Sequence, residues 1–308
     1  MLRRRALGLI AGLALGLAAC STGTTGSSTP TPSSAAAAYP VTVGAVTLDK
    51  QPTKIVSLGP TATEMLFAIG AGAQVIAADD QSNYPSNAPK TDLSAFKPNA
   101  EAIAAKNPDL VVLTNDSDKI VAQLTALKIP AFLVPAATTL EDTYKELADL
   151  GKLTGHAAEA DKVVADVKTQ LDAVVKSVKT RTKPLTYFYE LSPDLYSATS
   201  KTFIGSIFTL FGLQNVADAA DADGKAFGYP QLSAEALVKA NPDLIFLADS
   251  KCCQQSADTV KARAGWSGVT AVSKGQIVAL DDDIASRWGP RVVELAKTIA
   301  DAVNKVPA

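Results

Sequence analysis

The sequence is poor in the residue types from which many reactive sites are built. Its 308 residues include one histidine, His156, and three cysteines. A single histidine excludes sites that need two or more, such as His-rich zinc sites and two-histidine iron triads. A Ser-His-Asp triad would have to use His156, which lies in a stretch rich in Ala, Glu and Lys that is typical of a helix. We therefore expect that the protein is not an enzyme and that it holds no metal ion and no cofactor.

Charged residues are also scarce, at 19% of the chain, and no long run of Lys or Arg is present. The 29 basic and 31 acidic side chains give a net charge of −2, which argues against a nucleic-acid partner. The hydrophobic fraction of 47% is sufficient for a sizeable core. At roughly 150 residues per domain, the length predicts one large domain or two modest lobes.

No apolar run is long enough to span a bilayer, but the N-terminus has the pattern of a secretory signal. Three arginines, Arg3 to Arg5, precede an apolar or glycine stretch over 6–19, which is shorter than the ~20 residues of a membrane helix. This stretch ends in Leu-Ala-Ala followed by Cys20, which resembles the lipobox of bacterial lipoproteins. We expect a signal peptide over 1–19, lipidation of Cys20, and an extracytoplasmic protein anchored to the cell membrane.

Residues 21–38 contain only Ser, Thr, Gly, Pro and Ala, and this composition predicts a flexible linker over 20–40. Removal of the signal also removes three basic residues. The mature chain then has 26 basic and 31 acidic residues and a net charge of −5.

The chain contains an internal repeat. Ala100–Asp116 matches Ala234–Ser250 at eight of seventeen positions, with a constant offset of 134 residues. Each copy reads as a short helix, an Asn-Pro-Asp turn and an apolar strand, and the residue before each proline, Asn107 or Asn241, is expected to end its helix. Alternating strands and helices indicate parallel sheets covered by helices. The repeat therefore predicts an α/β fold of two similar lobes.

A single long helix is predicted between the lobes. Apolar residues recur at intervals of three and four over 157–180, at Ala160, Val164, Val167, Leu171, Val174 and Val178. Such a helix would be about 36 Å long, enough to span both lobes. We expect an N-terminal α/β lobe over 41–140, a helical segment over 141–182 and a C-terminal α/β lobe over 183–308.

The first lobe is predicted to begin with a strand over 54–58 and a glycine turn, followed by a helix that a capping box at Thr61–Glu64 opens. Ligands of open α/β sheets bind beyond the carboxyl ends of the strands. The loops after Leu58, Leu113, Leu247 and Leu280 are therefore where a binding site is expected.

These features resemble the substrate-binding proteins of ABC importers for iron-siderophores, haem and vitamin B12. The resemblance is carried by Pro52–Leu58 with Thr63-Glu64, and most specifically by the Glu-x-Ile-x-x-x-x-Pro-Asp-Leu-Val pattern over 101–111. It runs from about Val41 to Val303. The family implies two α/β lobes bridged by one long helix, with a ligand in the cleft between them and no catalytic activity.

The resemblance also implies docking to an ABC permease. In the family, each lobe presents a glutamate to arginines of the permease, and the matching positions are Glu101 and Glu235. The repeat relates these two residues, as an importer with two-fold symmetry requires. The alternative is that each is simply a glutamate favoured by the dipole at the start of its helix.

Within the family, the segments Asp80–Pro85 and Tyr229–Ser233 look most like the branch that binds cobalamin. Three positions differ from that branch, since Phe96 and Tyr229 replace its usual tryptophans and Trp288 replaces a small residue. Aromatic side chains suit a large flat macrocycle. The candidate ligand contacts implied by the resemblance are Tyr84, Phe96, Glu190, Tyr196, Tyr229, Asp283, Arg287 and Trp288.

A ferric siderophore is the main alternative ligand, and haem is a further one. Siderophores are often anionic, and Asp281, Asp282 and Asp283 beside Arg287 are expected to repel an anion. The three aspartates could instead form a solvated turn or pair with Arg287 and Arg291. We expect a monomer whose partners are a permease and a corrinoid or ferric-siderophore ligand.

Two adjacent cysteines, Cys252 and Cys253, follow a predicted C-lobe strand and are therefore expected near the rim of the cleft. They could form a vicinal disulfide, remain as two free thiols or capture a soft metal ion.

Overall fold

The computed structural model describes residues 39–307. The predicted signal peptide over 1–19, the lipidation site Cys20 and most of the linker over 20–40 lie outside these residues. No helix within 39–307 combines the length and apolar character needed to cross a lipid bilayer. Residues 39–307 belong to one compact unit.

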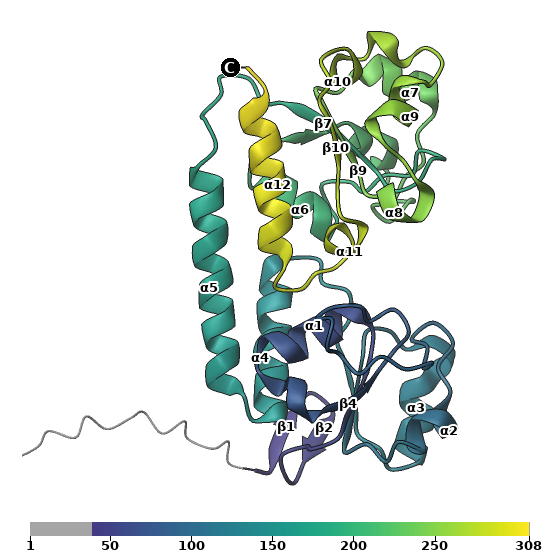
Figure 1. Ribbon diagram of the computed structural model, residues 1–308, viewed down its shortest axis with the longest axis vertical. Helices are drawn as coiled ribbons and strands as arrows, with labels where there is room; N and C mark the ends of the chain where they lie inside the picture. Colours follow the sequence, from purple (N-terminus) through teal and green to yellow (C-terminus); the bar gives the residue numbers. More distant parts are fainter. Residues whose placement is uncertain (1–38, 308) are drawn as a thin grey trace, which may run out of the picture. The chain divides into compact units, whose positions relative to one another are not determined.

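The first half of this unit, with α1, α2 and α3 around β4 in Figure 1, is built on a parallel sheet. The order of its strands is β4-β3-β5-β6. A short antiparallel hairpin precedes the sheet. The elements are β1 (Val41–Val43), β2 (Val46–Leu48), β3 (Ile55–Leu58), α1 (Pro60–Ala68), η1 (Ala71–Gln74), β4 (Val75–Ala78), α2 (Ala100–Ala104), β5 (Leu110–Leu113), η2 (Ser117–Lys119), α3 (Ile120–Ala126) and β6 (Ala131–Leu133).

The second half contains a parallel sheet of the same topology, β8-β7-β9-β10. Its elements are β7 (Thr186–Glu190), α6 (Phe203–Thr209), β8 (Gln214–Asn215), η3 (Val216–Asp221), α7 (Ala234–Ala240), β9 (Leu244–Leu247), α8 (Ser250–Cys253), α9 (Ala257–Lys261), η4 (Trp266–Gly268), α10 (Thr270–Ser273), β10 (Ile277–Ala279), α11 (Asp282–Ala285) and α12 (Val292–Lys305). Two parallel sheets with the same strand order confirm the predicted two-lobe α/β fold.

The Asn-Pro-Asp repeat performs the same task in both lobes. Asp109 Oδ2 accepts hydrogen bonds from the backbone N–H and hydroxyl of Thr53, just before β3. Asp243 Oδ2 accepts the same pair from Thr186, at the start of β7. Each aspartate thus ties the first strand of its parallel sheet, β3 or β7, to the strand of its repeat copy, β5 or β9. Charge-assisted hydrogen bonds of this kind align the two strands.

The helix between the lobes is α5, which runs from Ala157 to Lys176. Its buried residue Ala160 packs into the N-lobe core, whereas Val167 and Leu171 pack into the C-lobe core. α5 therefore joins both cores, as predicted, and α4 (Leu140–Thr154) accompanies it (Figure 1). Tyr144 of α4 belongs to the C-lobe core, and Leu147 belongs to the N-lobe core.

α5 is four residues shorter than predicted, and the reason is a tertiary contact. Beyond its end, the backbone N–H of Lys179 donates to Asn304 Oδ1, and Asn304 Nδ2 donates to the carbonyl of Ser177. α12 therefore supplies the side chain that redirects the chain after Ser177. In the sequence, Val174 and Val178 simply continue the apolar stripe, so the pattern does not reveal the contact with Asn304.

The predicted capping box at the start of α1 is wrong. The helix begins at Pro60 with Gly59 as its N-cap and has no side-chain cap. Gly59 has φ 131°, and a Cβ there would lie 2.3 Å from Thr114 Oγ1, so the close approach of β3 and β5 requires glycine. Glu64, the expected capping residue, instead points to groups more than two hundred residues away.

Candidate functional site

Aromatic side chains are exposed on loops that follow the strands of both sheets. Tyr84 and Phe96 lie in the loop after β4 and are 45% and 72% exposed, while Tyr196 and Tyr229 of the C-lobe are 45% and 51% exposed. Large aromatic groups are usually buried, so exposed ones on neighbouring loops indicate a binding surface. The structure thus leaves these four predicted ligand contacts available.

Backbone bridges hold the two C-lobe aromatic residues close together. Tyr196 forms an isolated antiparallel bridge with Gln231, two residues after Tyr229. The N–H of Ser197 also donates to the carbonyl of Pro230. The loop after β7 and the loop before α7 therefore form one ordered surface, although they are about thirty residues apart in sequence.

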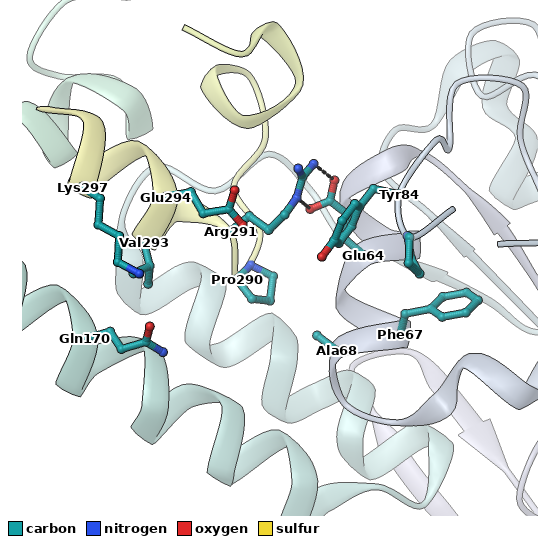
Figure 2. Close-up of a pocket in the computed structure, with 11 residues that line it drawn as sticks. Glu64, Phe67, Ala68, Tyr84, Gln170, Pro290, Arg291, Val293, Glu294 and Lys297 are labelled. Atoms are coloured by element: carbon teal, nitrogen blue, oxygen red, sulfur yellow. Dashed lines mark hydrogen bonds and ion pairs between the residues drawn. The ribbon is translucent and has the colours of Figure 1, made fainter. Parts of the chain in front are cut away.

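A buried carboxylate connects the first lobe to the C-terminal segment. Glu64 of α1 is 3% exposed, and its Oε1 accepts from Arg287 Nη1 and from Arg291 Nη2, each at 2.6 Å. Its Oε2 accepts from Arg291 Nε at 2.9 Å. The Arg291 guanidinium also lies over the Tyr84 ring, 4.1 Å from its centre. Figure 2 shows Arg291 with Glu64 and Tyr84 at the edge of a pocket of about 420 Å³ that α1, α5 and α12 line.

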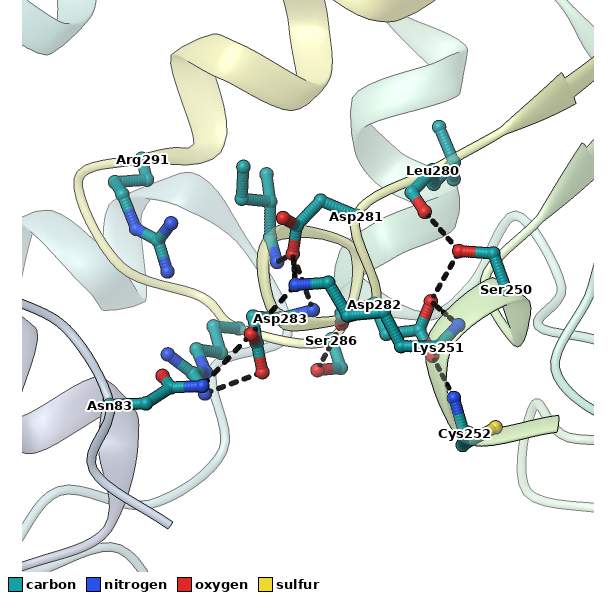
Figure 3. Close-up of polar contacts among 12 residues, drawn as sticks. Asn83, Ser250, Lys251, Cys252, Leu280, Asp281, Asp282, Asp283, Ser286 and Arg291 are labelled. Carbon is teal, nitrogen blue, oxygen red and sulfur yellow. Dashed lines mark hydrogen bonds and ion pairs between the residues drawn. The ribbon is translucent and has the colours of Figure 1, made fainter. Parts of the chain in front are cut away.

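The three consecutive aspartates do not form a free anionic patch, contrary to the expectation that they would repel an anion. Lys251 Nζ donates to both Asp281 and Asp283, and Asp282 accepts from Ser250 Oγ and from the N–H groups of two α8 residues (Figure 3). Against the opposing effect of burial, hydrogen bonds from Lys251 and Asn83 hold the pKa of Asp283 below its ordinary value. The aspartates are therefore largely neutralised by local donors.

Asp283 also links the two lobes. Its Oδ1 accepts from Arg287 Nη2 at 2.7 Å, and its Oδ2 accepts from Asn83 Nδ2 of the N-lobe at 3.0 Å. Arg287 is 8% exposed and divides its guanidinium between Glu64 and Asp283. Arg287 therefore positions Asp283, and its own donors are directed into the protein rather than toward a ligand. Arg291 pairs with Glu64, not with the aspartates.

The cysteine pair lies on α8, directly beside this acidic cluster. Cys252 and Cys253 form a disulfide between adjacent residues. The N–H of Cys252 donates to Asp282 Oδ2 at 2.9 Å, which ties the disulfide turn to α11. Within residues 39–307, no three or more His, Cys, Asp or Glu side chains converge on a position suited to a metal ion.

Glu190 occupies the interior of the C-lobe, not the ligand surface that the sequence suggested. It is fully buried at the end of β7, and its two oxygens accept from the Nη atoms of Arg263 at 2.5 and 2.7 Å. Arg263 also lies over the ring of Trp266. Burial, and then the charge of Glu190, raises the pKa of the neighbouring Asp249 carboxyl. A bidentate, desolvated pair of this kind is a structural contact.

Trp288 is likewise a packing residue rather than an open ligand contact. Its ring packs against the cores of both lobes, and its Nε1 donates to Glu146 Oε2 of α4 at 3.1 Å. Its carbonyl accepts from the Thr143 hydroxyl. The large ring of Trp288 therefore fills the junction between α4 and the segment before α12.

Replacing Glu146 with glutamine is expected to change how stability depends on pH. Burial raises the pKa of Glu146 from 4.5 to about 8, against the smaller effect of the Trp288 hydrogen bond. The folded protein therefore keeps a proton on Glu146 that the unfolded chain releases. The contribution of this protonated carboxyl to stability is full below about pH 4.5 and is lost as the pH rises to about 8. Relative to the wild type, Glu146→Gln should gain about 1–3 kcal/mol between about pH 5 and about pH 8.5.

Urea unfolding at these two pH values measures the effect. Glu141→Gln, an exposed site on the same helix, is the control and should follow the wild type. If the stability of Glu146→Gln changes with pH as much as that of the wild type, the pKa of Glu146 is not raised in the folded protein.

The two predicted docking glutamates occupy equivalent places. Glu101 and Glu235 are the second residues of α2 and α7, whose N-caps Asn99 and Ser233 each accept from the N–H three residues later. Both side chains are exposed, and among the described residues no cation lies within 4.0 Å of either. The structure thus presents one free carboxylate at the start of the same helix in each lobe.

Sequence reasoning missed Phe227, which is 88% exposed. It lies two residues before Tyr229 in a loop rich in Asp, Ala and Gly. The resemblance that points to Tyr229 begins at that residue, so the signal for Phe227 is a large apolar side chain in a polar loop. It also missed Glu64 as an inter-lobe contact, because its partners are 223 and 227 residues away in sequence.

Comparisons with known proteins agree on the type of protein. The family model described as "Periplasmic binding protein" matches residues 55–284. The Bacillus subtilis protein called "Uncharacterized ABC transporter substrate-binding lipoprotein YvrC" is 31% identical over 279 residues, which cover 86% of each chain. A "Cobalamin-binding protein" of Halobacterium salinarum is 29% identical over 269 residues, covering 84% of this chain and 72% of that protein.

Among solved structures, the chain is similar to one described as a possible iron-binding (periplasmic solute-binding) protein from Staphylococcus epidermidis. The TM-score is 0.73 at 27% sequence identity, and the match covers 83% of this chain and 100% of the other. The relatives thus include both cobalamin and iron among the ligands in their names.

Proposed function

The chain belongs to the periplasmic binding protein family, and from this premise we propose that it binds a corrinoid of the vitamin B12 type between its lobes. Its general role follows from the family: it is a substrate-binding protein of an ABC importer of the vitamin B12, haem and siderophore type, and not an enzyme. Such proteins act outside the cytoplasm, bind a ligand and pair with permease subunits.

The exposed aromatic residues on both lobes carry the proposal for a corrinoid. Tyr84 and Phe96 from one lobe and Tyr196 and Tyr229 from the other offer flat apolar faces with a few polar tips. A corrinoid has extended apolar faces and an amide fringe, which this combination suits. Asp283, held by Asn83 and Lys251, is the polar contact that we propose for the fringe. Glu190 and Trp288 are left out of this ligand surface.

A ferric siderophore or haem is the alternative ligand. The neutralised aspartates favour it more than the sequence suggested, because Lys251 and Arg287 offset the charge that would repel an anion. The iron-binding description of one similar structure supports the same alternative.

Titration distinguishes these ligands. Residues 39–308 should bind cyanocobalamin at micromolar concentration or tighter, and quenching of the fluorescence of Trp266 and Trp288 measures this. Tyr84→Ala and Tyr229→Ala should each weaken binding about tenfold or more, since each removes an exposed aromatic face. The melting temperature should stay unchanged in Tyr229→Ala and fall slightly in Tyr84→Ala, which also removes the ring beneath Arg291. No binding of cyanocobalamin together with binding of hemin or a ferric chelate would contradict the corrinoid proposal.

We further propose that the mature protein is a monomer anchored through a lipid on Cys20, and that Glu101 and Glu235 dock on the permease. Anchoring is supported by the lipobox pattern and by the similarity to a substrate-binding lipoprotein. Docking is supported by the matching positions of the two glutamates on α2 and α7.

A further inference from the structure

Phe227 is the most exposed large apolar side chain within residues 39–307, at 88%. It lies in the loop between η3 and α7, two residues before Tyr229. A phenylalanine in water forfeits the free energy that burial of its ring would provide. An exposed phenylalanine in an ordered loop therefore calls for a partner outside the folded chain.

The loop around Phe227 is held rigidly. Asp221 is only 2% exposed, and its two carboxylate oxygens accept from the N–H groups of Ala226 and Gly228, each at 2.8 Å. These amides flank Phe227 on both sides. At Gly228, with φ 88°, a Cβ would lie 2.7 Å from Thr202 Cγ2, so the loop packs closely on the start of α6.

Phe227 itself adopts a backbone conformation that is unfavourable for its residue type. Its φ is 52°, in the left-handed region that glycine or asparagine occupies more readily. A smaller residue would therefore suit the fold better at this position. The buried Asp221 keeps the ring exposed in spite of this strain, which points to a role outside folding.

The ring also lies beside the other lobe. Phe227 and Tyr229 line a pocket of about 250 Å³ together with Ala136, Ala137 and Thr138. These three residues lie between β6 of the N-lobe sheet and α4, whereas Phe227 follows the C-lobe strand β8. The pocket is therefore formed between the C-lobe loop and the segment that connects β6 of the N-lobe to α4, and Phe227 is part of its lining.

We propose that Phe227 is a ligand-recognition residue that packs its ring against an apolar face or edge of the bound ligand, next to Tyr229. This inference rests on the proposed function of the inter-lobe surface. It assigns the ring a part in specificity, because a flat ligand with large apolar faces covers it whereas a compact hydrophilic chelate leaves it in water.

The decisive variant is Phe227→Gly, because it should weaken ligand binding without weakening the fold. Glycine relieves the positive φ, so the melting temperature should stay the same or rise. Loss of the ring should raise the Kd for cyanocobalamin about tenfold or more. Phe227→Trp keeps an aromatic face and should bind within about threefold of the wild type. Leu127→Ala removes an exposed apolar side chain elsewhere and should leave the Kd unchanged.

The outcomes separate this inference from the proposed ligand. A Phe227→Gly variant that binds as tightly as the wild type overturns the role of Phe227. A variant that binds normally but lowers uptake also overturns it and assigns the ring to the permease. Failure of the wild type to bind cyanocobalamin, with binding of hemin or a ferric chelate, overturns only the corrinoid proposal. The same variants titrated with that other ligand then support or overturn the role of Phe227.

Discussion

Glu64→Ala is expected to lower the free energy of unfolding by about 3–5 kcal/mol, the largest stability effect that we predict. The Glu64 side chain is 2% exposed and is the carboxylate that binds Arg287 and Arg291 together. The side chains of Arg287 and Arg291 are 9% and 16% exposed, so removal of Glu64 leaves largely buried positive charge without its main partner. The cost of an unpaired buried charge is much larger than the net contribution of the intact pair.

Urea or thermal unfolding of the purified protein measures this loss. The triple variant Glu64→Met, Arg287→Met, Arg291→Met removes all three charges together and should recover most of the stability, because apolar side chains of similar volume replace a buried ion group at little cost. Glu159→Ala, which removes a half-exposed carboxylate on α5, is the control and should change stability by less than about 0.5 kcal/mol. A loss below about 1 kcal/mol for Glu64→Ala would show that the cluster does not hold the lobes together.

Charge reversal at the two proposed docking sites should have the largest functional effect. Glu101→Lys or Glu235→Lys alone is expected to lower uptake of cyanocobalamin about tenfold or more, and the double variant should reduce it further. In the proposed docking, each change replaces an attraction to permease arginines with repulsion. Both side chains are exposed, so ligand affinity should be unaffected. A lysine on the first turn of a helix should lower the free energy of unfolding by at most about 1 kcal/mol, which leaves the protein folded.

Uptake of labelled cyanocobalamin by cells that carry the variant in place of the wild-type gene measures docking, and titration of the purified protein measures ligand binding. Asp258→Lys makes the same charge change on the first turn of another C-lobe helix, α9, and should leave uptake unchanged. Normal uptake by the double variant would exclude a docking role for both glutamates. Reduced ligand binding would instead mean that these residues belong to the ligand surface.

The close agreement between sequence and structure for the two lobes has a local cause. Each copy of the repeat encodes its helix, its turn and its strand within seventeen residues, and Asp109 and Asp243 bind the neighbouring strand in the same way. Hydrophobic periodicity and turn residues act over a few positions, so they can be read without knowledge of the fold. The same holds for the placement of Glu101 and Glu235 on equivalent helices.

The failures concern polar side chains whose partners are far apart in sequence. The local pattern predicts a helix cap for Glu64, and the resemblance implies a ligand contact for Glu190 and Trp288. Each instead binds a group that folding brings to it, 73 to 227 residues away. Three consecutive aspartates predict repulsion of an anion, but Lys251, thirty residues earlier in the sequence, pairs with two of them.

The sequence by itself therefore determined the two-lobe architecture, the helix that joins the lobes and the exposed glutamates, because periodic and repeated patterns are local properties of the chain. Only the tertiary structure decided which charges are neutralised, which aromatic rings are free and where Phe227 lies. Burial and pairing depend on which loops the two separate sheets bring together, and ion pairs form between the groups that meet there.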